Sequence, residues 1–384
     1  MTVTSRRVLF VDHAGVMGGA EFSLLDIAAA FAGRAEVILL ADGPFRAMLE
    51  RHGIAVHVHA LGAFARVKKA GSLPSPSAVW DAIRIARWLA ARAGAFDLIY
   101  ANSQKSFVVA AVAGWMAGKP VVWHLRDLLA APHFSLANIR VVTWLANHGA
   151  DRVIANSRAT ADAFIAAGGH EALVRVVHNG IDSAPFDAVT DESARTCRVE
   201  LGIAPDLPLV LHVGRFHHWK GQQVLLRALA LERRPVACFV GAPLFGEDEF
   251  AESLRAEAAR LGVSDRVKWL GFRDDVARLM RAADIVVHSS VYPEPFGRVV
   301  VEAMLAGTPV IAARAGGVPE IVAHGETGWL VPPDDAAALA AAISELLNDP
   351  SRARALAARA AIHARERFGR EAMLRGVGDA LASL

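Results

Sequence analysis

The stretch VLFVDHAGVMGGAEFSLLDIAAAF, residues 8–31, combines an expected strand, a glycine-rich loop and an expected helix. Its first part, Val8–Val11, is a continuous apolar run, which is typical of a strand buried on both faces. A loop with Gly18 and Gly19 follows, and a helical pattern then runs to Phe31. This order presents backbone N–H groups to an anion. The spacing is not G-x-G-x-x-G, so it does not predict a nicotinamide cofactor.

The alternation of strand and helix continues along the chain, on both sides of a change in composition at residues 183–208. Further strands are expected at 37–40, 55–59, 98–100, 121–124, 153–155, 209–213, 237–240, 267–270, 285–288 and 310–312. Such alternation predicts parallel strands with helical crossovers. We therefore expect an α/β protein with two Rossmann-like doubly wound domains facing across a cleft, at residues 1–185 and 186–365, and a C-terminal helix, 366–384, that packs on the N-terminal domain.

Composition argues against several classes of protein. Of the 384 residues 54% are hydrophobic, and the formal net charge is only +2, which does not favour binding to nucleic acid. Cys197 and Cys238 are too few for a disulfide framework and are typical of a reducing compartment. The longest apolar stretch, Phe107–Gly118, is shorter than the ~20 residues of a membrane span. We expect a cytoplasmic protein.

One segment of the first half combines basic and aromatic side chains. A loop at residues 62–75 carries Lys68 and Lys69, and the helix after it interleaves Trp80 and Trp88 with arginines. An ordinary amphipathic crossover helix explains this pattern. The alternative is a surface that contacts a substrate or the inner face of the plasma membrane, because basic residues beside aromatic ones favour interfaces.

A second informative stretch is YPEPFGRVVVEAM, residues 292–304. A proline-rich turn brings Glu294 to a helix that Phe296 and Gly297 open, and Glu302 lies about a turn and a half into it. The N–H groups and the positive dipole end at a helix N-terminus suit a phosphate or a sugar hydroxyl. A capped helix with two solvated glutamates explains the stretch equally well.

From position 214 the sequence GRFHHWKG places Arg215 and Lys220 at a strand end and a helix start, a suitable pair for clamping a diphosphate. It is not a Walker A loop. His212, His217 and His218 lie in the same region, but no cysteine, aspartate or glutamate stands close to them in the sequence. We therefore expect no metal site.

Other polar residues and turns follow expected strands, where doubly wound sheets carry their ligands. His124 ends the run Val-Val-Trp-His, and a loop residue with ordinary hydrogen bonds is the simpler explanation for it. Gly241 and Phe272 stand at two further strand ends. These turns could border a nucleotide base, and ordinary turns explain them equally well.

Together these residues resemble the retaining glycosyltransferases of the GT-B fold, family 4 (glycosyl transferases group 1). The resemblance covers nearly the whole chain, and its motifs stand in the family's order. They are Gly18-Gly19-Ala20-Glu21, His178-Asn179-Gly180-Ile181-Asp182, Gly214-Arg215 with Lys220-Gly221, the glutamate pair Glu294 and Glu302 in PFGxxxxEAM, and Gly316-Gly317-Val318-Pro319-Glu320.

The resemblance implies a role for each motif. Arg215 and Lys220 would bind the diphosphate of a nucleotide-sugar, Glu302 the ribose, and Glu294 the transferred sugar. His124 would reach the sugar, and backbone N–H groups around Phe296 would meet sugar or phosphate oxygens. The implied catalytic set is His124, Arg215, Lys220 and Glu294, and the implied donor site is Gly18, Gly19, Arg215, Lys220, Gly241, Phe272, Glu294, Phe296, Gly297 and Glu302.

The activity so implied is transfer of a sugar, with retention, from a GDP- or UDP-linked donor to a glycan or lipid-linked saccharide in cell-surface polysaccharide or glycolipid synthesis. It needs no metal and no other cofactor. Two alternatives share the architecture: a nucleotide-sugar 2-epimerase, which needs no acceptor, and a non-catalytic scaffold subunit.

Overall fold

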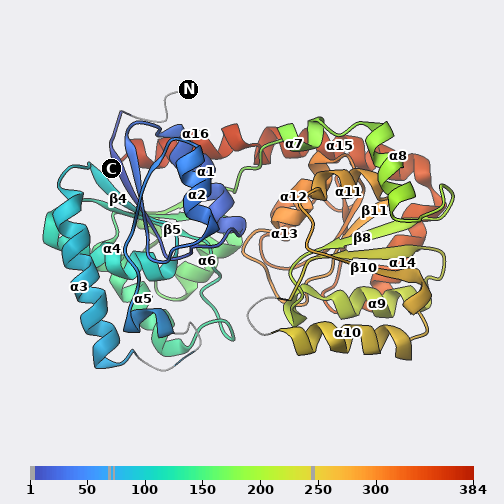
Figure 1. The fold of residues 1–384 in the computed structure, drawn as a ribbon, viewed down its shortest axis with the longest axis horizontal. Helices are drawn as coiled ribbons and strands as arrows, with labels where there is room; N and C mark the ends of the chain where they lie inside the picture. The colour runs from blue at the N-terminus through green and yellow to red at the C-terminus, as the bar shows by residue number, and fades with distance from the viewer. Residues whose placement is uncertain (1–4, 68–70, 72–73, 244–246) are drawn as a thin grey trace. The chain divides into compact units, whose positions relative to one another are not determined.

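The computed structural model describes residues 5–67, 71, 74–243 and 247–384. The chain forms two compact units, residues 1–180 with 370–384, and residues 181–369. The divisions fall a few residues from the expected 185/186 and 365/366. Each unit holds one parallel sheet with helices on both faces, as a doubly wound α/β fold requires (Figure 1).

The first unit is built on a seven-stranded sheet in the order β3-β2-β1-β4-β5-β6-β7. Its strands are β1 (Val8–Asp12), β2 (Ala35–Leu39), β3 (Ala55–Val58), β4 (Leu98–Ala101), β5 (Val121–Leu125), β6 (Arg152–Ala155) and β7 (Val174–Val176). Its α-helices are α1 (Gly19–Ala30), α2 (Pro44–Arg51), α3 (Pro76–Ala93), α4 (Gln104–Ala117), α5 (Leu136–Gly149), α6 (Arg158–Ala166) and α16 (Arg370–Ala382), with 3-10 turns at Ala63–Arg66 and Glu171–Leu173. The strand order reverses between β1 and β4, where such sheets bind ligands. Strand β7 was not expected.

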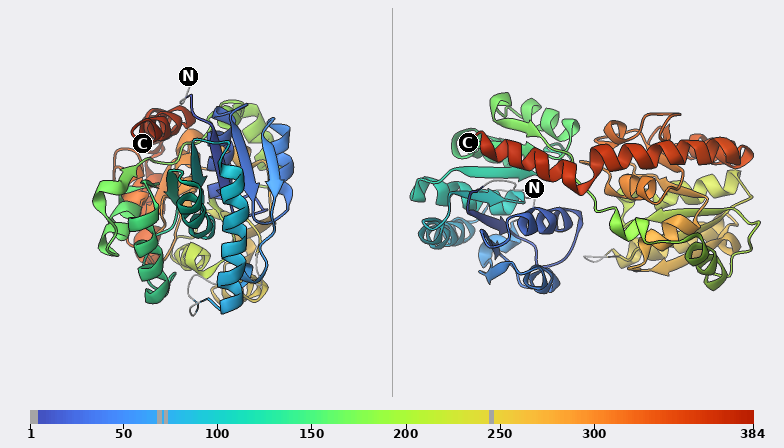
Figure 2. Two further views of the ribbon diagram at one scale, coloured as in Figure 1. Left: turned by 90° about the vertical axis from the view of Figure 1, so that its left-hand side faces the viewer. Right: turned by 90° about the horizontal axis from the view of Figure 1, so that it is seen from above.

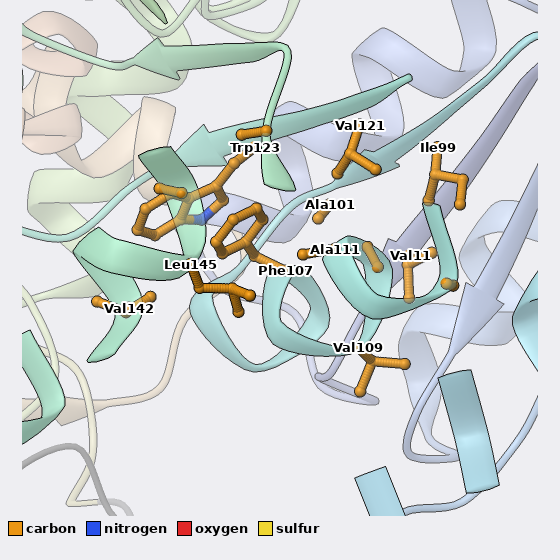
Figure 3. Close-up of a cluster of buried hydrophobic side chains, with 14 of the residues drawn as sticks. Val11, Ile99, Ala101, Phe107, Val109, Ala111, Val121, Trp123, Val142 and Leu145 are labelled. Carbon is orange, nitrogen blue, oxygen red and sulfur yellow. The ribbon is translucent and has the colours of Figure 1, made fainter. Parts of the chain in front are cut away.

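Two hydrophobic clusters lie on the two faces of this sheet. Helices α3, α4 and α5 cover one face, where Phe107 stacks on Trp123 at a ring distance of 4.4 Å (Figures 2 and 3). Helices α1, α2 and α16 cover the other. Met373 and Leu381 of α16 are buried there, and the Gly180 N–H donates to the Met373 sulfur at 3.1 Å. The last helix of the chain is therefore part of the first unit.

The second unit has a six-stranded sheet in the order β10-β9-β8-β11-β12-β13. Its strands are β8 (Leu209–Val213), β9 (Val236–Val240), β10 (Val267–Gly271), β11 (Ile285–His288), β12 (Val310–Ala313) and β13 (Trp329–Val331). Its α-helices are α7 (Ala184–Asp187), α8 (Asp191–Glu200), α9 (Gln222–Leu231), α10 (Asp248–Arg260), α11 (Val276–Ala282), α12 (Arg298–Leu305), α13 (Val318–Ile321), α14 (Ala336–Asn348) and α15 (Pro350–Phe368), with 3-10 turns η3 (His218–Lys220) and η4 (Ser264–Arg266). Strand β13 was not expected.

The segment expected to connect the domains is more regular than its composition indicated. It contains α7 and α8, and both belong to the second unit. Thr190 caps α8, since its side chain accepts the Ser193 N–H, and Ala194 and Cys197 on one face of the helix are buried. The helix escaped prediction because its buried face holds two small side chains among charged ones.

The basic and aromatic segment is only partly exposed. The Trp80 side chain is 73% exposed, whereas Trp88 stacks on His59 at a ring distance of 4.5 Å. Lys68 and Lys69 lie outside the described residues. Among the described residues, no helix combines the length and the apolar character needed to cross a bilayer.

Candidate functional site

An ion pair joins two loops at the carboxyl edge of the second sheet. Lys220 ends the turn η3 after β8, and Glu294 follows β11, the neighbour of β8 in the sheet. Lys220 Nζ lies 2.7 Å from Glu294 Oε1, and the two side chains are 31% and 19% exposed. The fold thus joins two predicted site residues that lie far apart in the sequence.

Three groups bond the same oxygen of Glu294. Besides Lys220, His288 Nε2 lies 3.0 Å from Oε1, and the Ser290 hydroxyl donates to it. Burial raises the pKa of the Glu294 carboxyl, but the charge of Lys220 and the hydrogen bonds from His288 and Lys220 outweigh it and bring the pKa well below its ordinary value. The carboxylate is therefore ionised at neutral pH. His288 and Ser290 were not predicted; their place at the end of β11 was the available signal.

Two glycines explain why these loops can meet. Gly221 has φ +71°, and a Cβ there would lie 1.8 Å from the Ser289 carbonyl oxygen. Gly316 has φ +60°, and its Cβ would lie 2.1 Å from the carbonyl oxygen of Glu294. The Gly317 N–H donates to that same oxygen at 2.9 Å. The glycine motifs after η3 and β12 therefore place the ion pair, since only glycine permits these approaches.

The second glutamate of the motif has its own cation. Glu302 Oε1 accepts a 2.7 Å bond from Arg298 Nε, one turn earlier on α12. Gly297 is the N-cap residue of this helix, with φ +108°, and as a glycine it offers no side chain to cap it. The Phe296 side chain is buried against Phe368, at a ring distance of 5.9 Å. Only the backbone of Phe296 can therefore take its predicted role.

Loops after three neighbouring strands bring the other predicted residues of this unit to the same edge. Gln222 Nε2 donates to the Arg215 carbonyl oxygen at 2.9 Å, which fixes the loop after β8. The Gly241 N–H donates to the Gly271 oxygen at 2.8 Å, so the loops after β9 and β10 run side by side. Phe272 follows, and its ring is 82% exposed.

In the first unit, His124 lies at the end of β5 and is completely buried. Its Nδ1 lies 2.5 Å from the Tyr100 hydroxyl and 3.2 Å from Arg126 Nη2. Burial first, and then the charge of Arg126, hold the pKa of His124 well below its ordinary value, so the ring is neutral. Its Nε2 has no partner within the described part of the chain.

His124 belongs to a polar network at the ends of β1, β4, β5 and β7. Arg126 donates to Asn102 Oδ1 at 2.7 Å and to Asn179 Oδ1 at 2.8 Å, and the Asn102 amide donates to the buried Asp12 carboxylate. Among these residues, only His124 and Asn179 stand out in the sequence. Only the sheet order shows that the members of the network bond one another.

Gly18 and Gly19 open α1 beside this network. Gly18 is its N-cap residue, and a Cβ there would lie 2.8 Å from Glu21 Oε2. Glu21 is buried, and burial together with the Asp12 charge raises the pKa of its carboxyl to about 7. The glycine at position 18 therefore leaves room for a buried carboxyl group.

The histidines after β8 have an acidic neighbour that the sequence did not indicate. We expected no acidic group beside them, yet Glu247 Oε1 lies 3.1 Å from His217 Nε2, and side-chain ligand atoms of His217, His218 and Glu247 lie within 4.8 Å of one another. Glu247 comes from the loop after β9, so the sequence alone does not show that it lies beside the histidines. His217 Nδ1 accepts the Trp219 N–H at 3.2 Å. A neutral His217 therefore carries its proton on Nε2, where it is donated to Glu247.

One hollow in the second unit lies away from this chemistry. It encloses about 830 Å³ and is lined by Pro208, Thr308 and Pro309, which precede β8 and β12, at the opposite edge of the sheet. Two of its arginines pair within the hollow, Arg281 with Asp191 and Arg365 with Asp187. Two ion pairs thus form among the charged side chains that line the hollow. The hollow is therefore a weaker candidate for the functional site than the edge that carries Lys220 and Glu294.

Two Rossmann-like units with these motifs at their sheet edges match two family models. Residues 17–184 match Glycosyltransferase Family 4, and residues 194–363 match Glycosyl transferases group 1. The chain belongs to the group 1 glycosyltransferases of family 4, with the GT-B fold, and is a transferase enzyme.

Individual proteins extend this assignment. The D-inositol 3-phosphate glycosyltransferase of Streptomyces bingchenggensis is 34% identical over 318 residues, which are 77% of this chain and 68% of the relative. Crystal structures of HepE from Anabaena, with UDP and with UDP-glucose, are 41% and 40% identical. They cover 98% and 99% of this chain and all of the other, with TM-scores of 0.90 and 0.89. Sucrose-phosphate synthase from Thermosynechococcus elongatus is 25% identical, covers 98% of each chain and has a TM-score of 0.77.

Proposed function

We propose that this enzyme transfers a hexose, with retention of configuration, from a UDP-linked donor to a glycan or lipid-linked saccharide. The observation that carries the proposal is the Lys220–Glu294 pair, a cation and an ionised carboxylate side by side at a sheet edge. A nucleotide-sugar needs both, since its diphosphate is anionic and its sugar offers hydroxyl donors. UDP-glucose bound to HepE supports UDP, rather than GDP, as the nucleotide.

The side chains suggest how the transfer proceeds. Lys220 and Arg215 would neutralise the charge that develops on the leaving UDP, and Glu302 would accept the ribose hydroxyls. Glu294 would hold the sugar. His124, Gly18 and Gly19 remain proposed contacts of the first unit with the donor, and Gly241, Phe272 and Gly297 of the second. No side chain is assigned as a nucleophile, and a phosphate oxygen of the leaving UDP would take the proton of the acceptor. Because the cations offset the charge, we propose that no metal is required.

The acceptor has two candidate classes. One is a growing glycan or lipid-linked saccharide at a membrane surface, for which the exposed Trp80 offers an apolar contact. The other is D-inositol 3-phosphate, the acceptor in the name of a relative that is 34% identical over 77% of the chain. Release of UDP measured with each acceptor in turn separates the two classes.

Binding of the donor is the first test. A ligand at ~100 times its dissociation constant adds about 2.7 kcal/mol of stability, which shifts the melting temperature measurably. UDP and UDP-glucose are expected to raise it more than GDP and GDP-sugars. A product formed from UDP-glucose without any acceptor would favour the epimerase, and binding without turnover on any acceptor would favour the scaffold. If no nucleotide shifts the melting temperature, the donor site is refuted.

A further inference from the structure

The three groups that bond Glu294 differ in exposure. Lys220 is a 31% exposed cation on a flexible stem, whereas His288 and Ser290 are only 6% and 2% exposed. All three groups donate a hydrogen bond to Oε1 of Glu294. Oε2 has no partner among the described residues, and it is not one of their buried unpartnered atoms, so it touches solvent. The carboxylate thus has one saturated oxygen and one available oxygen.

The bonds also assign the proton of His288. An ionised carboxylate only accepts, so Nε2 of His288 must donate to Oε1. Nδ1 is buried and without a partner in the described chain. His288 is therefore a donor to Glu294 through its Nε2 proton.

We propose that His288 and Ser290 are positioning residues, which hold Glu294 when Lys220 turns to the diphosphate of the donor. This inference rests on the proposed function. The ammonium of Lys220 has three protons, and the diphosphate carries more negative charge than one carboxylate, so it competes for Lys220. The two buried donors stay, because β11 fixes His288 and Ser290 follows it. Glu294 then keeps its orientation and presents Oε2 alone to the hydroxyls of the sugar.

Binding constants for UDP and UDP-glucose test whether Lys220 binds the diphosphate while His288 and Ser290 orient Glu294 toward the sugar. Ser290→Ala and His288→Leu should bind UDP about as well as wild type, since Glu294 meets the sugar and not the nucleotide. They should bind UDP-glucose about tenfold more weakly, because a hydrogen bond to a charged group is lost. His288→Gln should recover most of that loss, since its amide N–H reaches a similar position. Lys220→Ala should weaken both ligands.

A control and a second measurement exclude a merely structural effect. Thr308→Val removes an equally buried hydroxyl, which donates to the Met280 oxygen at 2.7 Å before β12, and should change neither constant. The acid limb of the pH profile of kcat/KM should move to higher pH in Ser290→Ala and His288→Leu, because Glu294 loses a donor to its ionised form. Melting curves without ligand show that each variant is folded.

The outcomes distinguish failure of the positioning role from failure of the proposed donor site. Equal weakening of UDP and UDP-glucose in Ser290→Ala, or unchanged binding of both, would overturn the positioning role while the donor site stands. Failure of wild type to bind either nucleotide would refute the proposed function and this inference with it.

Discussion

Lys220 and Glu294, 74 positions apart in the sequence, share a 2.7 Å ion pair at the carboxyl edge of the second sheet. Neither residue defines a site alone: a lysine in a 3-10 turn and a glutamate before a helix are ordinary surface groups. The pair becomes informative because His288 and Ser290 converge on the same carboxylate oxygen. Such convergence keeps a partly buried carboxylate ionised, as the proposed role of Glu294 in holding the sugar requires.

Removing either member of the pair should abolish transfer. Lys220→Ala and Glu294→Ala are each expected to lower kcat/KM for UDP-glucose by about a hundredfold or more, since each removes a preorganised group from the reacting centre. UDP release, measured with a coupled assay, reports the rate. Arg352→Ala is the control, because its pair with Glu345 is exposed and contributes little. Turnover near that of wild type in either site variant would refute the assigned roles.

Gly316→Ala should distort the loop that carries Glu294. The new Cβ would combine a left-handed φ of +60° with an approach of 2.1 Å to the Glu294 carbonyl oxygen. We expect a destabilisation of about 3 kcal/mol or more, and a loss of activity. Gly325→Ala separates the two causes, since Gly325 has φ +77° but its Cβ would meet no described atom within 4 Å. It should cost about 1 kcal/mol. Equal melting temperatures in the two variants would contradict the steric account.

Glu21 should make the first unit less stable as pH rises. Its pKa is raised from 4.5 to about 7, so between these values the folded chain binds more protons than the unfolded chain. Stability from this group is therefore present below pH 4.5 and lost as pH rises through about 7. With about 1.4 kcal/mol per pKa unit, the change amounts to about 3–4 kcal/mol. Glu21→Gln should melt higher than wild type at pH 8, and the difference should shrink toward pH 5. A difference that does not vary with pH would contradict the assignment.

Chelation should leave the reaction intact. Lys220 and Arg215 are proposed to offset the diphosphate charge, so EDTA should not lower the rate of UDP release from UDP-glucose. The same assay with added Mn²⁺ or Mg²⁺ should give an equal rate. A loss with EDTA that either ion restores would show that the cations do not suffice, and would direct attention to His217, His218 and Glu247.

The last helix should be needed for the stability of the first unit. Leu381 is completely buried in the cluster that α16 shares with α1 and β1, so Leu381→Ala should cost about 2–5 kcal/mol. Arg375→Ala, on the exposed side of the same helix, should cost little. Chemical denaturation followed by tryptophan fluorescence measures both. A small effect of Leu381→Ala would mean that α16 adds little to the unit.

The sequence by itself determined the fold class and most of the strands. Continuous apolar runs such as Val8–Val11 are buried on both faces, and only a sheet covered by helices on both sides accommodates them. Two short strands, β7 and β13, and helix α8 escaped prediction. Their three-residue runs and small buried side chains carry too weak a periodic signal.

The sequence also singled out Glu294, Glu302, Arg215 and Lys220 as site residues. What only the tertiary structure decided is which side chains bond one another. Glu294 pairs with Lys220, and Glu247 stands beside His217. The physical reason is the parallel sheet, which places loops from strands far apart in the chain at one edge. Spacing along the chain predicts pairs within a helix, such as Arg298 and Glu302, but the order of the strands decides the others.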